Sequence, residues 1–324
     1  AAFRGAQHRK GLNQQPVIVI GGPTASGKSE TALALAGHFG GEIVNADSMQ
    51  VYADLPIVTA QPSRADLARA PHHLYGVLGT CDRCSAGQWR DLALDAIRDI
   101  HRRGALPIVV GGTGLYLRAL MTGLHDMPSV PAGIRDRLNR RLKGEGAQAL
   151  HTVLAAGDPD TAASLNPADG QRIVRALEVL EYTGRGLRSW QNGQREDAPA
   201  DLSFLTLSLL PPRDYLYDLA NGRFDRMLDQ GAVEEVESLL SRTPAEDFPL
   251  LKAIGVLPIR AYLRQEIDMD RLKELVKRDT RRYAKRQMTW FRHQFIPQIS
   301  IQTKQSEINW DKTFSEIRNY VLTD

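Results

Sequence analysis

One octapeptide constrains the fold of this chain more than any other feature. The residues Gly22-Pro23-Thr24-Ala25-Ser26-Gly27-Lys28-Ser29 match the pattern G-x-x-x-x-G-K-[ST] in full. A β-branched run at 17–20 predicts a buried strand before this phosphate loop, and apolar residues at helical spacing over 29–39 predict a helix after it. In that context, converging backbone N–H groups and the positive end of the helix dipole predict a phosphate site. Lys28 adds a mobile cation, and the Ser29 hydroxyl suits Mg²⁺.

Further strands and helices alternate after the loop. Residues 42–47 and 106–110 have the composition of strands, a Ser85/Gln88 capping box starts a helix, and 115–120 continue as a helix after a Gly-rich turn. This alternation predicts an α/β fold with a parallel-sheet, phosphate-loop core. Residues 124–201 show helical patterns and no convincing strand, whereas 203–210 again have strand composition and the chain after Pro212 is mostly helical.

The chain therefore divides into three parts. We expect a flexible tail at 1–15, a core formed by 16–123 and 202–324 with C-terminal helices, and an all-helical insertion at 124–201. The hydrophobic share of 42% excludes a disordered chain, and two cysteines exclude a disulfide-built scaffold. No apolar run approaches the roughly 18 residues of a membrane helix.

Charge is unevenly distributed although the net charge is only +3. Residues 271–293 hold nine Lys or Arg against two acids, and residues 133–143 hold five against one. Two basic stretches in a nearly neutral chain favour a polyanionic partner; a solvated helix face is the alternative.

The predicted strand ends bring further polar groups toward the phosphate loop. The second strand ends in Asp47, and the third ends in a Gly-rich turn with Thr113 and no acid. Because parallel strands open their carboxyl ends onto one crevice, Asp47, Thr113 and the loop should meet there. Asp47 can hold Mg²⁺, as in a kinase, or accept a proton from an incoming nucleophile; the spacing alone does not decide between these roles.

Several segments in order resemble the tRNA dimethylallyltransferases (isopentenyltransferases). Besides the phosphate loop they are 47–52 (DSMQVY), 71–74 (PHHL), 111–116 (GGTGLY), 171–179 (QRIVRALEV), 252–255 (KAIG) and 283–292 (YAKRQMTWFR). The resemblance implies transfer of a dimethylallyl group from dimethylallyl diphosphate to the exocyclic amine of the adenosine 3′-adjacent to a tRNA anticodon, with Mg²⁺. It further implies that the phosphate loop and Arg223 bind the diphosphate, that Asp47 is the catalytic base and that Thr113 lies near the reacting centre.

The resemblance also implies a contact surface for the anticodon stem-loop, whose target base must leave its stack. The expected tRNA contacts are Asp47, Ser48, Met49, Gln50, Thr113, Arg135, Gln171, Arg172, Ile173, Val174, Arg175, Lys285, Arg286, Gln287, Thr289, Trp290 and Arg292. On a helix, Lys285, Thr289 and Arg292 share one face, while Tyr283, Met288 and Phe291 lie toward another.

This chain departs from the family pattern at three positions. Val58 and Gln61 stand where the family usually has a glycine and a Lys or Arg, and Val256 replaces an aromatic residue. We therefore expect no phosphate contact at 58 or 61. Cys81 and Cys84, with His72 and His73 upstream, form a single CxxC that favours incidental thiols over a zinc or redox site.

Three other functions compete with this one. An adenylate isopentenyltransferase acting on a free nucleotide shares the phosphate loop and Asp47, but needs neither the insertion nor the basic 285–292 segment. A small-molecule kinase is the second, and a non-catalytic RNA-binding module is the third, although it leaves Lys28 and Asp47 unexplained. We expect a cytoplasmic, monomeric enzyme without a membrane association.

Overall fold

The computed structural model describes residues 3–4, 14–125, 127–191, 197–243 and 247–322. Two compact units emerge from its internal contacts. One comprises Ala1–Thr122 with Pro199–Asp324 and contains the sheet; the other is Gly123–Ala198 and is helical. Within the described residues, no helix combines the length and the apolar character needed to cross a membrane.

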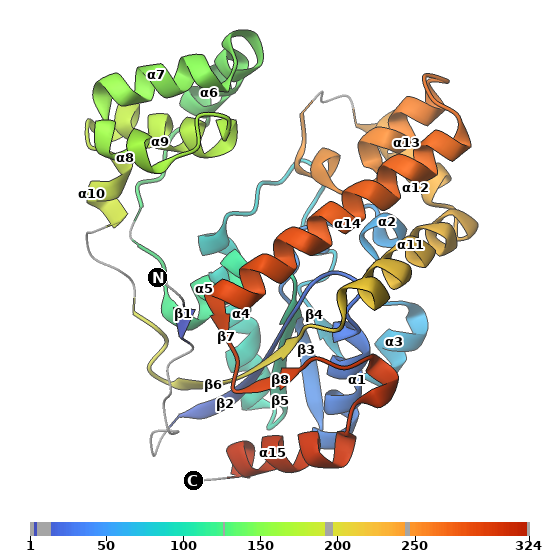
Figure 1. The fold of residues 1–324 in the computed structure, drawn as a ribbon. Coiled ribbons are helices and arrows are strands. Elements are labelled where there is room, and N and C mark those ends of the chain that lie inside the picture. The colour runs from blue at the N-terminus through green and yellow to red at the C-terminus, as the bar shows by residue number, and fades with distance from the viewer. Residues whose placement is uncertain (1–2, 5–13, 126, 192–196, 244–246, 323–324) are drawn as a thin grey trace. The chain divides into compact units, whose positions relative to one another are not determined.

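The first unit is an α/β structure whose strands are coloured blue to red in chain order in Figure 1. Its strands are β1 (Phe3–Arg4), β2 (Gln15–Gly21), β3 (Gly41–Asn45), β4 (His72–His73), β5 (Leu106–Gly111), β6 (Leu202–Leu209), β7 (Phe295–Ile296) and β8 (Ile299–Ile301). Its helices are α1 (Lys28–Phe39), α2 (Pro56–Thr59), α3 (Arg64–Arg69), α4 (Ala86–Arg102), α5 (Gly114–Thr122), α11 (Arg213–Asp229), α12 (Ala232–Arg242), α13 (Val256–Leu263), α14 (Met269–Gln294) and α15 (Trp310–Leu322), with 3₁₀ turns η1 (Pro249–Lys252) and η2 (Gln305–Glu307).

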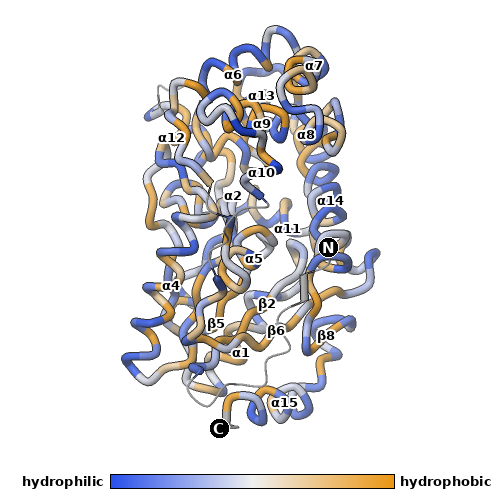
Figure 2. Tube along the Cα trace, turned by 90° about the vertical axis from the view of Figure 1, so that its left-hand side faces the viewer, coloured by the Kyte–Doolittle hydropathy of each residue, from blue (hydrophilic) through white to orange (hydrophobic). Residues whose placement is uncertain are grey.

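Six parallel strands form the central sheet in the order β4-β3-β5-β2-β6-β8. Alternate residues of each strand enter two different cores: Val17 and Val19 pack with α4 and α5, whereas Ile18 and Ile20 pack with α1 and α15. Burial on both faces explains the continuous apolar runs that predict these strands, which are largely orange in Figure 2. The expected phosphate-loop α/β core is confirmed.

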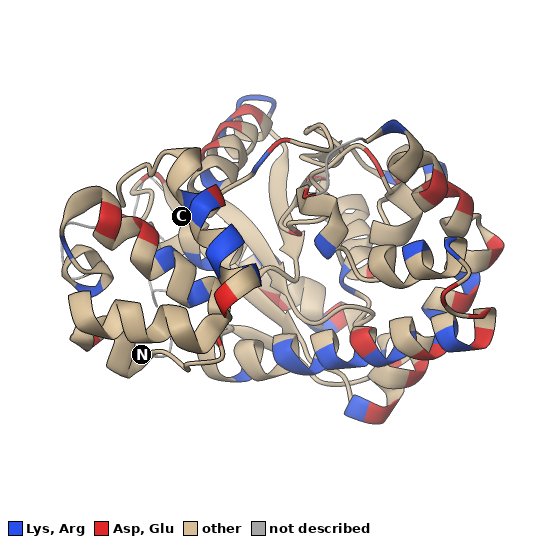
Figure 3. Cartoon of the chain, turned by 90° about the horizontal axis from the view of Figure 1, so that it is seen from above, with Lys and Arg blue, Asp and Glu red and all other residues tan. Residues whose placement is uncertain are grey.

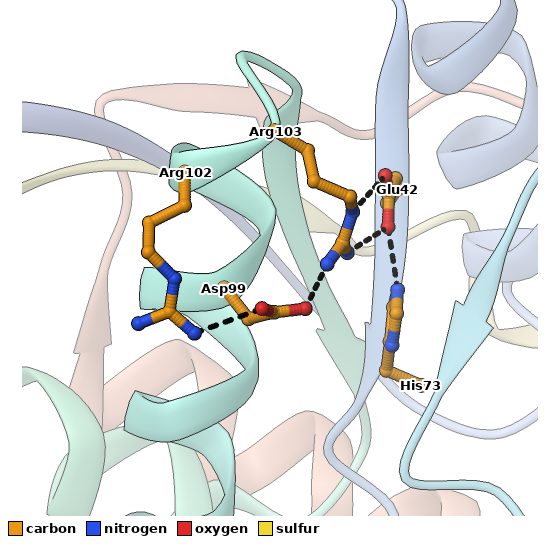
Figure 4. A network of polar contacts seen from close by, with 5 residues as sticks. All are labelled: Glu42, His73, Asp99, Arg102 and Arg103. Atoms are coloured by element: carbon orange, nitrogen blue, oxygen red, sulfur yellow. Dashed lines mark hydrogen bonds and ion pairs between the residues drawn. The ribbon is translucent and has the colours of Figure 1, made fainter.

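Ion pairs brace β3 next to the β4 edge of the sheet (Figure 4). The buried carboxylate of Glu42 accepts hydrogen bonds from His73 Nε2 at 2.6 Å and from Arg103 Nη2 at 2.7 Å. Arg103, the residue that caps α4, also pairs with Asp99. Hydrogen bonds from Arg103 lower the pKa of the Glu42 carboxyl. The network ties β3, β4 and the end of α4 together.

In its described residues, the second unit contains five helices around its own core. They are α6 (Ala132–Glu145), α7 (Ala147–Gly157), α8 (Pro159–Ser164), α9 (Gly170–Thr183) and α10 (Leu187–Gln191). Leu138, Leu150, Leu154 and Leu177 are buried between them. α9 packs against both α6 and α7, and the Asp169 side chain caps its N-terminus.

The structure adds short strands that the sequence analysis did not anticipate. β8 extends the sheet beyond β6 although the chain after Pro212 was expected to be mostly helical, and β4 forms the opposite edge. Phe3–Arg4, inside the segment expected to be a flexible tail, pairs with Phe295–Ile296, and Gln15 already belongs to β2. Residues 5–13 of that tail lie outside the described residues.

Candidate active site

The phosphate loop turns tightly between β2 and α1. Gly27 has φ of 88°, a left-handed conformation that favours glycine, and Ala25 also has a positive φ of 63°. Within the loop the Ser26 hydroxyl is buried, without a hydrogen-bond partner among the described residues. A buried, unpaired hydroxyl is costly in a finished structure, and an anion seated in the loop would satisfy it.

Two cations converge on the loop. Lys28 Nζ donates a hydrogen bond to the Pro23 carbonyl at 2.6 Å, and Arg223 Nη1, from α11, donates to Thr24 Oγ1 at 2.9 Å. Withdrawal from water lowers the pKa of Lys28 to about 7. The same cause lowers the pKa of Arg223, while the nearby Asp47 carboxylate opposes both shifts. Asp47 thus offsets the desolvation of both groups only in part, and a diphosphate would supply further negative charge.

These groups line one cavity of about 340 Å³. Its wall includes the loop residues 24–29, Asp47 and Gln50, the turn at Gly111 and Gly112, and Gln287 from α14. Arg223 and Arg226 lie on the α11 side of the wall. The crevice expected at the carboxyl ends of β2, β3 and β5 is therefore present, with an acid and several cations facing the same space.

Asp47 and Thr113 are joined through Ser48. The Asn45 side chain accepts a hydrogen bond from Asp47 N at 2.8 Å, and Asp47 Oδ1 accepts one from Met49 N at 2.9 Å. Thr113 Oγ1 accepts from Ser48 N at 3.0 Å. Residues 45–49 thus form a turn whose internal bonds fix the Asp47 carboxylate, and Thr113 anchors that turn to the end of β5.

α14 closes against glycines at the strand ends. A Cβ atom added to Gly21 would lie 2.4 Å from Phe291, one added to Gly112 would lie 2.3 Å from Gln287, and one added to Gly114 would lie 2.5 Å from the Trp290 ring. Real Cβ atoms do not approach so closely, so the glycines permit the helix to sit directly on the β2 and β5 ends.

The opposite face of α14 is basic and exposed. Figure 3 shows Lys and Arg bands repeating along this long helix. Its exposed residues include Lys285, Arg286, Thr289 and Arg292, while Leu272, Val276, Met288 and Phe291 are buried. The amphipathic pattern expected from the sequence is therefore observed, and Trp290 and Tyr283 are half-buried. Gln287 is 6% exposed and bonds to protein groups on the cavity side.

In the helical unit, the expected tRNA contacts have different environments. Gln171 and Arg172 are exposed, whereas Arg135 and Arg175 both pair with the buried Glu178 carboxylate. Ile173 and Val174 belong to the core of the unit. Packing against neighbouring helices occupies these two side chains, and the tRNA contacts expected along this segment stay a prediction.

Tyr75 and Arg226 also line the cavity, although the sequence analysis did not single them out. Arg226 follows Arg223 by three residues on α11, a spacing that places both on one helix face and was the available signal. No sequence pattern indicated Tyr75, because it lies in the loop after β4. Burial together with the nearby Asp47 charge raises the pKa of Tyr75 and of Tyr283, so both phenols stay neutral.

The positions that depart from the family pattern have structural roles. Val58 and Val256 are buried in the core, and Gln61 Nε2 donates to the Tyr52 carbonyl at 2.7 Å. Cys81 is exposed and Cys84 is half-buried. Among the described residues, no group of three His, Cys, Asp or Glu side chains is arranged to hold a metal ion.

Comparisons with known proteins agree with this geometry. The model of the IPP transferase family matches residues 50–294, and that of the isopentenyl transferases matches residues 15–75. A tRNA dimethylallyltransferase of Rhodospirillum centenum is 51% identical over 280 residues, covering 86% of this chain and 89% of the relative. One of Paramagnetospirillum magneticum is 42% identical over 308 residues, covering 95% and 98%.

Solved structures show the same likeness. The tRNA isopentenylpyrophosphate transferase of Bacillus halodurans is 34% identical with a TM-score of 0.64, covering 95% of this chain and 96% of its own. A eukaryotic dimethylallyltransferase described as acting on tRNA is 28% identical with a TM-score of 0.75, covering 94% and 78%. The chain therefore belongs to the IPP transferase family of tRNA-modifying prenyltransferases.

Proposed function

We propose that this prenyltransferase transfers a dimethylallyl group from dimethylallyl diphosphate to the exocyclic amine of the adenosine 3′-adjacent to the tRNA anticodon. The products are N6-dimethylallyladenosine and diphosphate. Family membership supports the tRNA dimethylallyl transfer. The observation that carries the rest is that the phosphate loop, Arg223 and the Asp47 carboxylate line one cavity. The diphosphate leaving group and the adenosine amine would then lie in one cavity, between the cations of the loop side and the Asp47 carboxylate.

The phosphate loop is proposed to hold the diphosphate leaving group. Ionisation of the allylic C–O bond puts negative charge on the departing oxygens, where the loop N–H groups, Lys28 and Arg223 stabilise it. The unpaired Ser26 hydroxyl and the incompletely compensated cations fit an anion of this kind. No residue that activates water is required, because water is not the nucleophile.

Mg²⁺ is the proposed metal cofactor. The site fits a metal shared with substrate: Ser29 is exposed and lines the cavity, so its hydroxyl would hold the ion beside the diphosphate oxygens. Mg²⁺ usually takes one or two protein oxygens, substrate phosphates and water. When bound, the ion neutralises charge on the diphosphate.

Asp47 is proposed as the proton acceptor. The adenine amine is a weak nucleophile, because its lone pair is delocalised into the ring. A carboxylate that accepts its hydrogen bond, and then its proton, increases its reactivity along the path to the allylic carbon. Thr113 is proposed to keep this carboxylate in place through the Ser48 backbone.

The tRNA interface is proposed to include Ser48, Met49 and Gln50, together with the half-buried Trp290 and the exposed α14 side chains Lys285, Arg286, Thr289 and Arg292. From the helical unit, Gln171, Arg172, Arg175 and Arg135 are proposed to contribute cations and amides. Extrusion of the base leaves an anticodon loop whose phosphates these cations can approach. We further propose that the enzyme acts in the cytoplasm as a monomer.

The test of the function offers the protein an anticodon stem-loop, Mg²⁺ and dimethylallyl diphosphate, and measures the mass of the RNA. A gain of one dimethylallyl group on the expected adenosine supports the proposal. Modification of free AMP at equal efficiency would instead indicate an adenylate isopentenyltransferase. ATP turnover without RNA would indicate a kinase.

The role of Asp47 is tested by Asp47→Asn, which keeps the size of the side chain but accepts a proton poorly. We expect the single-turnover rate to fall by about 100-fold or more while stem-loop affinity stays within about twofold. An unchanged single-turnover rate would remove Asp47 as the base.

A further inference from the structure

A single buried amide connects α14 to both sides of the reaction site. Gln287 Oε1 accepts a hydrogen bond from Thr24 N at 2.8 Å, in the phosphate loop. Gln287 Nε2 donates to the Gly112 carbonyl at 2.9 Å, in the turn that leads to Thr113. Because the loop offers an N–H and the turn offers a carbonyl, only this orientation of the amide satisfies both.

Thr24 is consequently held from two directions. Its backbone N–H is fixed by Gln287 and its hydroxyl by Arg223. Because the Thr24 N–H donates to Gln287, it orients the loop and is not a free donor for the diphosphate. Gly112 leaves room for this amide, because a Cβ at that position would lie 2.3 Å from Gln287 Nε2.

We propose that Gln287 is a positioning residue that sets the distance and angle between the diphosphate loop and the Gly112–Thr113 turn, and that it is not a contact to the tRNA base. The inference rests on the proposed function, because it concerns the alignment of leaving group and nucleophile. The amide lies on the buried face of α14, and the RNA-facing cations lie on the exposed face. Movement of α14 would therefore reach both substrate sites through Gln287.

The substitution Gln287→Met tests this role, because methionine has nearly the same volume but offers neither bond. The matched control is Gln294→Met, the same change at the last residue of α14. We expect Gln287→Met to weaken binding of inorganic diphosphate with Mg²⁺ by about tenfold or more, measured by calorimetry. The single-turnover rate should fall by a similar or larger factor, and stem-loop affinity should stay within about twofold.

Three outcomes overturn the proposal. A loss of stem-loop affinity with unchanged diphosphate affinity would make Gln287 an RNA contact. A lower active fraction with unchanged diphosphate affinity and unchanged KM would leave only a role in folding. Equal effects of Gln287→Met and Gln294→Met on diphosphate affinity and on the single-turnover rate would show that position 287 has no special role.

If Gln287→Met does not fold, Gln287→Asn replaces it: the amide is retained but is one methylene too short for both bonds, so the diphosphate affinity should still fall. Failure of the proposed function is separately visible, because wild-type protein would then not modify the stem-loop at all.

Discussion

The contact between α14 and the start of α5 predicts a large penalty for one added methyl group. Gly114 is the first residue of α5, and its φ is not positive. Its backbone conformation is therefore one that alanine also adopts. The added Cβ would nevertheless lie 2.5 Å from three atoms of the Trp290 ring. Ordinary carbon contacts are about 3.5 Å or longer, so the ring must move by about 1 Å.

The ring cannot move freely, because it packs against Phe291 and Phe295 with centroids 5.0 and 6.5 Å away. Overpacking of this kind costs about 1–3 kcal/mol, and Gly114→Ala should lower the free energy of unfolding by that amount. Gly37→Ala is the matched control: the position is helical, and an added Cβ meets no atom of the described residues within 4 Å. It should stabilise the protein by about 0.5–1 kcal/mol.

Urea denaturation of both variants measures the difference, and a double-mutant cycle with Trp290→Leu assigns it to the ring. We expect the coupling between Gly114→Ala and Trp290→Leu to be about 1–3 kcal/mol, because removal of the ring relieves the clash. Equal stabilities of Gly114→Ala and Gly37→Ala, or no coupling in the cycle, would refute the packing of α14 on this turn.

Three further predictions concern substrate binding and pH. Arg223→Ala should raise the KM for dimethylallyl diphosphate by about tenfold or more while stem-loop affinity is kept, and steady-state kinetics check this. Neutralising Lys285 and Arg286 together should weaken stem-loop binding and reduce the slope of log affinity against log salt by up to about two; an unaltered slope would favour a solvated face. Since Arg103 lowers the pKa of Glu42, the pair contributes stability above the ordinary pKa of 4.5 that is lost as the pH falls through the lowered value. Unfolding midpoints from pH 6 to pH 3 should therefore fall less steeply for Glu42→Gln than for the wild type, and parallel curves would contradict this.

Local sequence signals were sufficient for the core of the fold. The apolar run before the phosphate loop became β2, and the Ser85/Gln88 box caps α4 with both predicted hydrogen bonds. The signals that predict these elements lie within a few residues of each other, although β2 itself pairs with the distant strands β5 and β6. β8 was missed because three residues carry too little pattern, and its stability comes from pairing with β6, about ninety positions earlier.

The sequence predicts those residues of the site that belong to a recognisable motif. The loop, Asp47 and Arg223 came from motifs or resemblance, and they line one cavity. The buried positions of Ile173 and Val174 could not be read from a motif, because a continuous motif on a helix includes residues of several faces, and only packing decides which face is buried. Gln287 was among the expected tRNA contacts, and its burial likewise could not be seen from the motif.

Two Gly-rich segments in this chain differ in whether a backbone angle requires the glycine. In the phosphate loop, Gly27 is needed for its backbone angle, since φ of 88° disfavours any residue with a Cβ, and also for space, because an added Cβ would lie 2.4 Å from Gln305 Oε1. In the turn after β5, Gly112 and Gly114 have ordinary angles and are needed for space, because Gln287 and Trp290 lie against them. A Gly-rich sequence alone does not distinguish a loop that binds an anion from a turn against which a helix packs. An alanine at Gly112 should therefore be tolerated once Gln287 is shortened, whereas no change elsewhere should rescue alanine at Gly27.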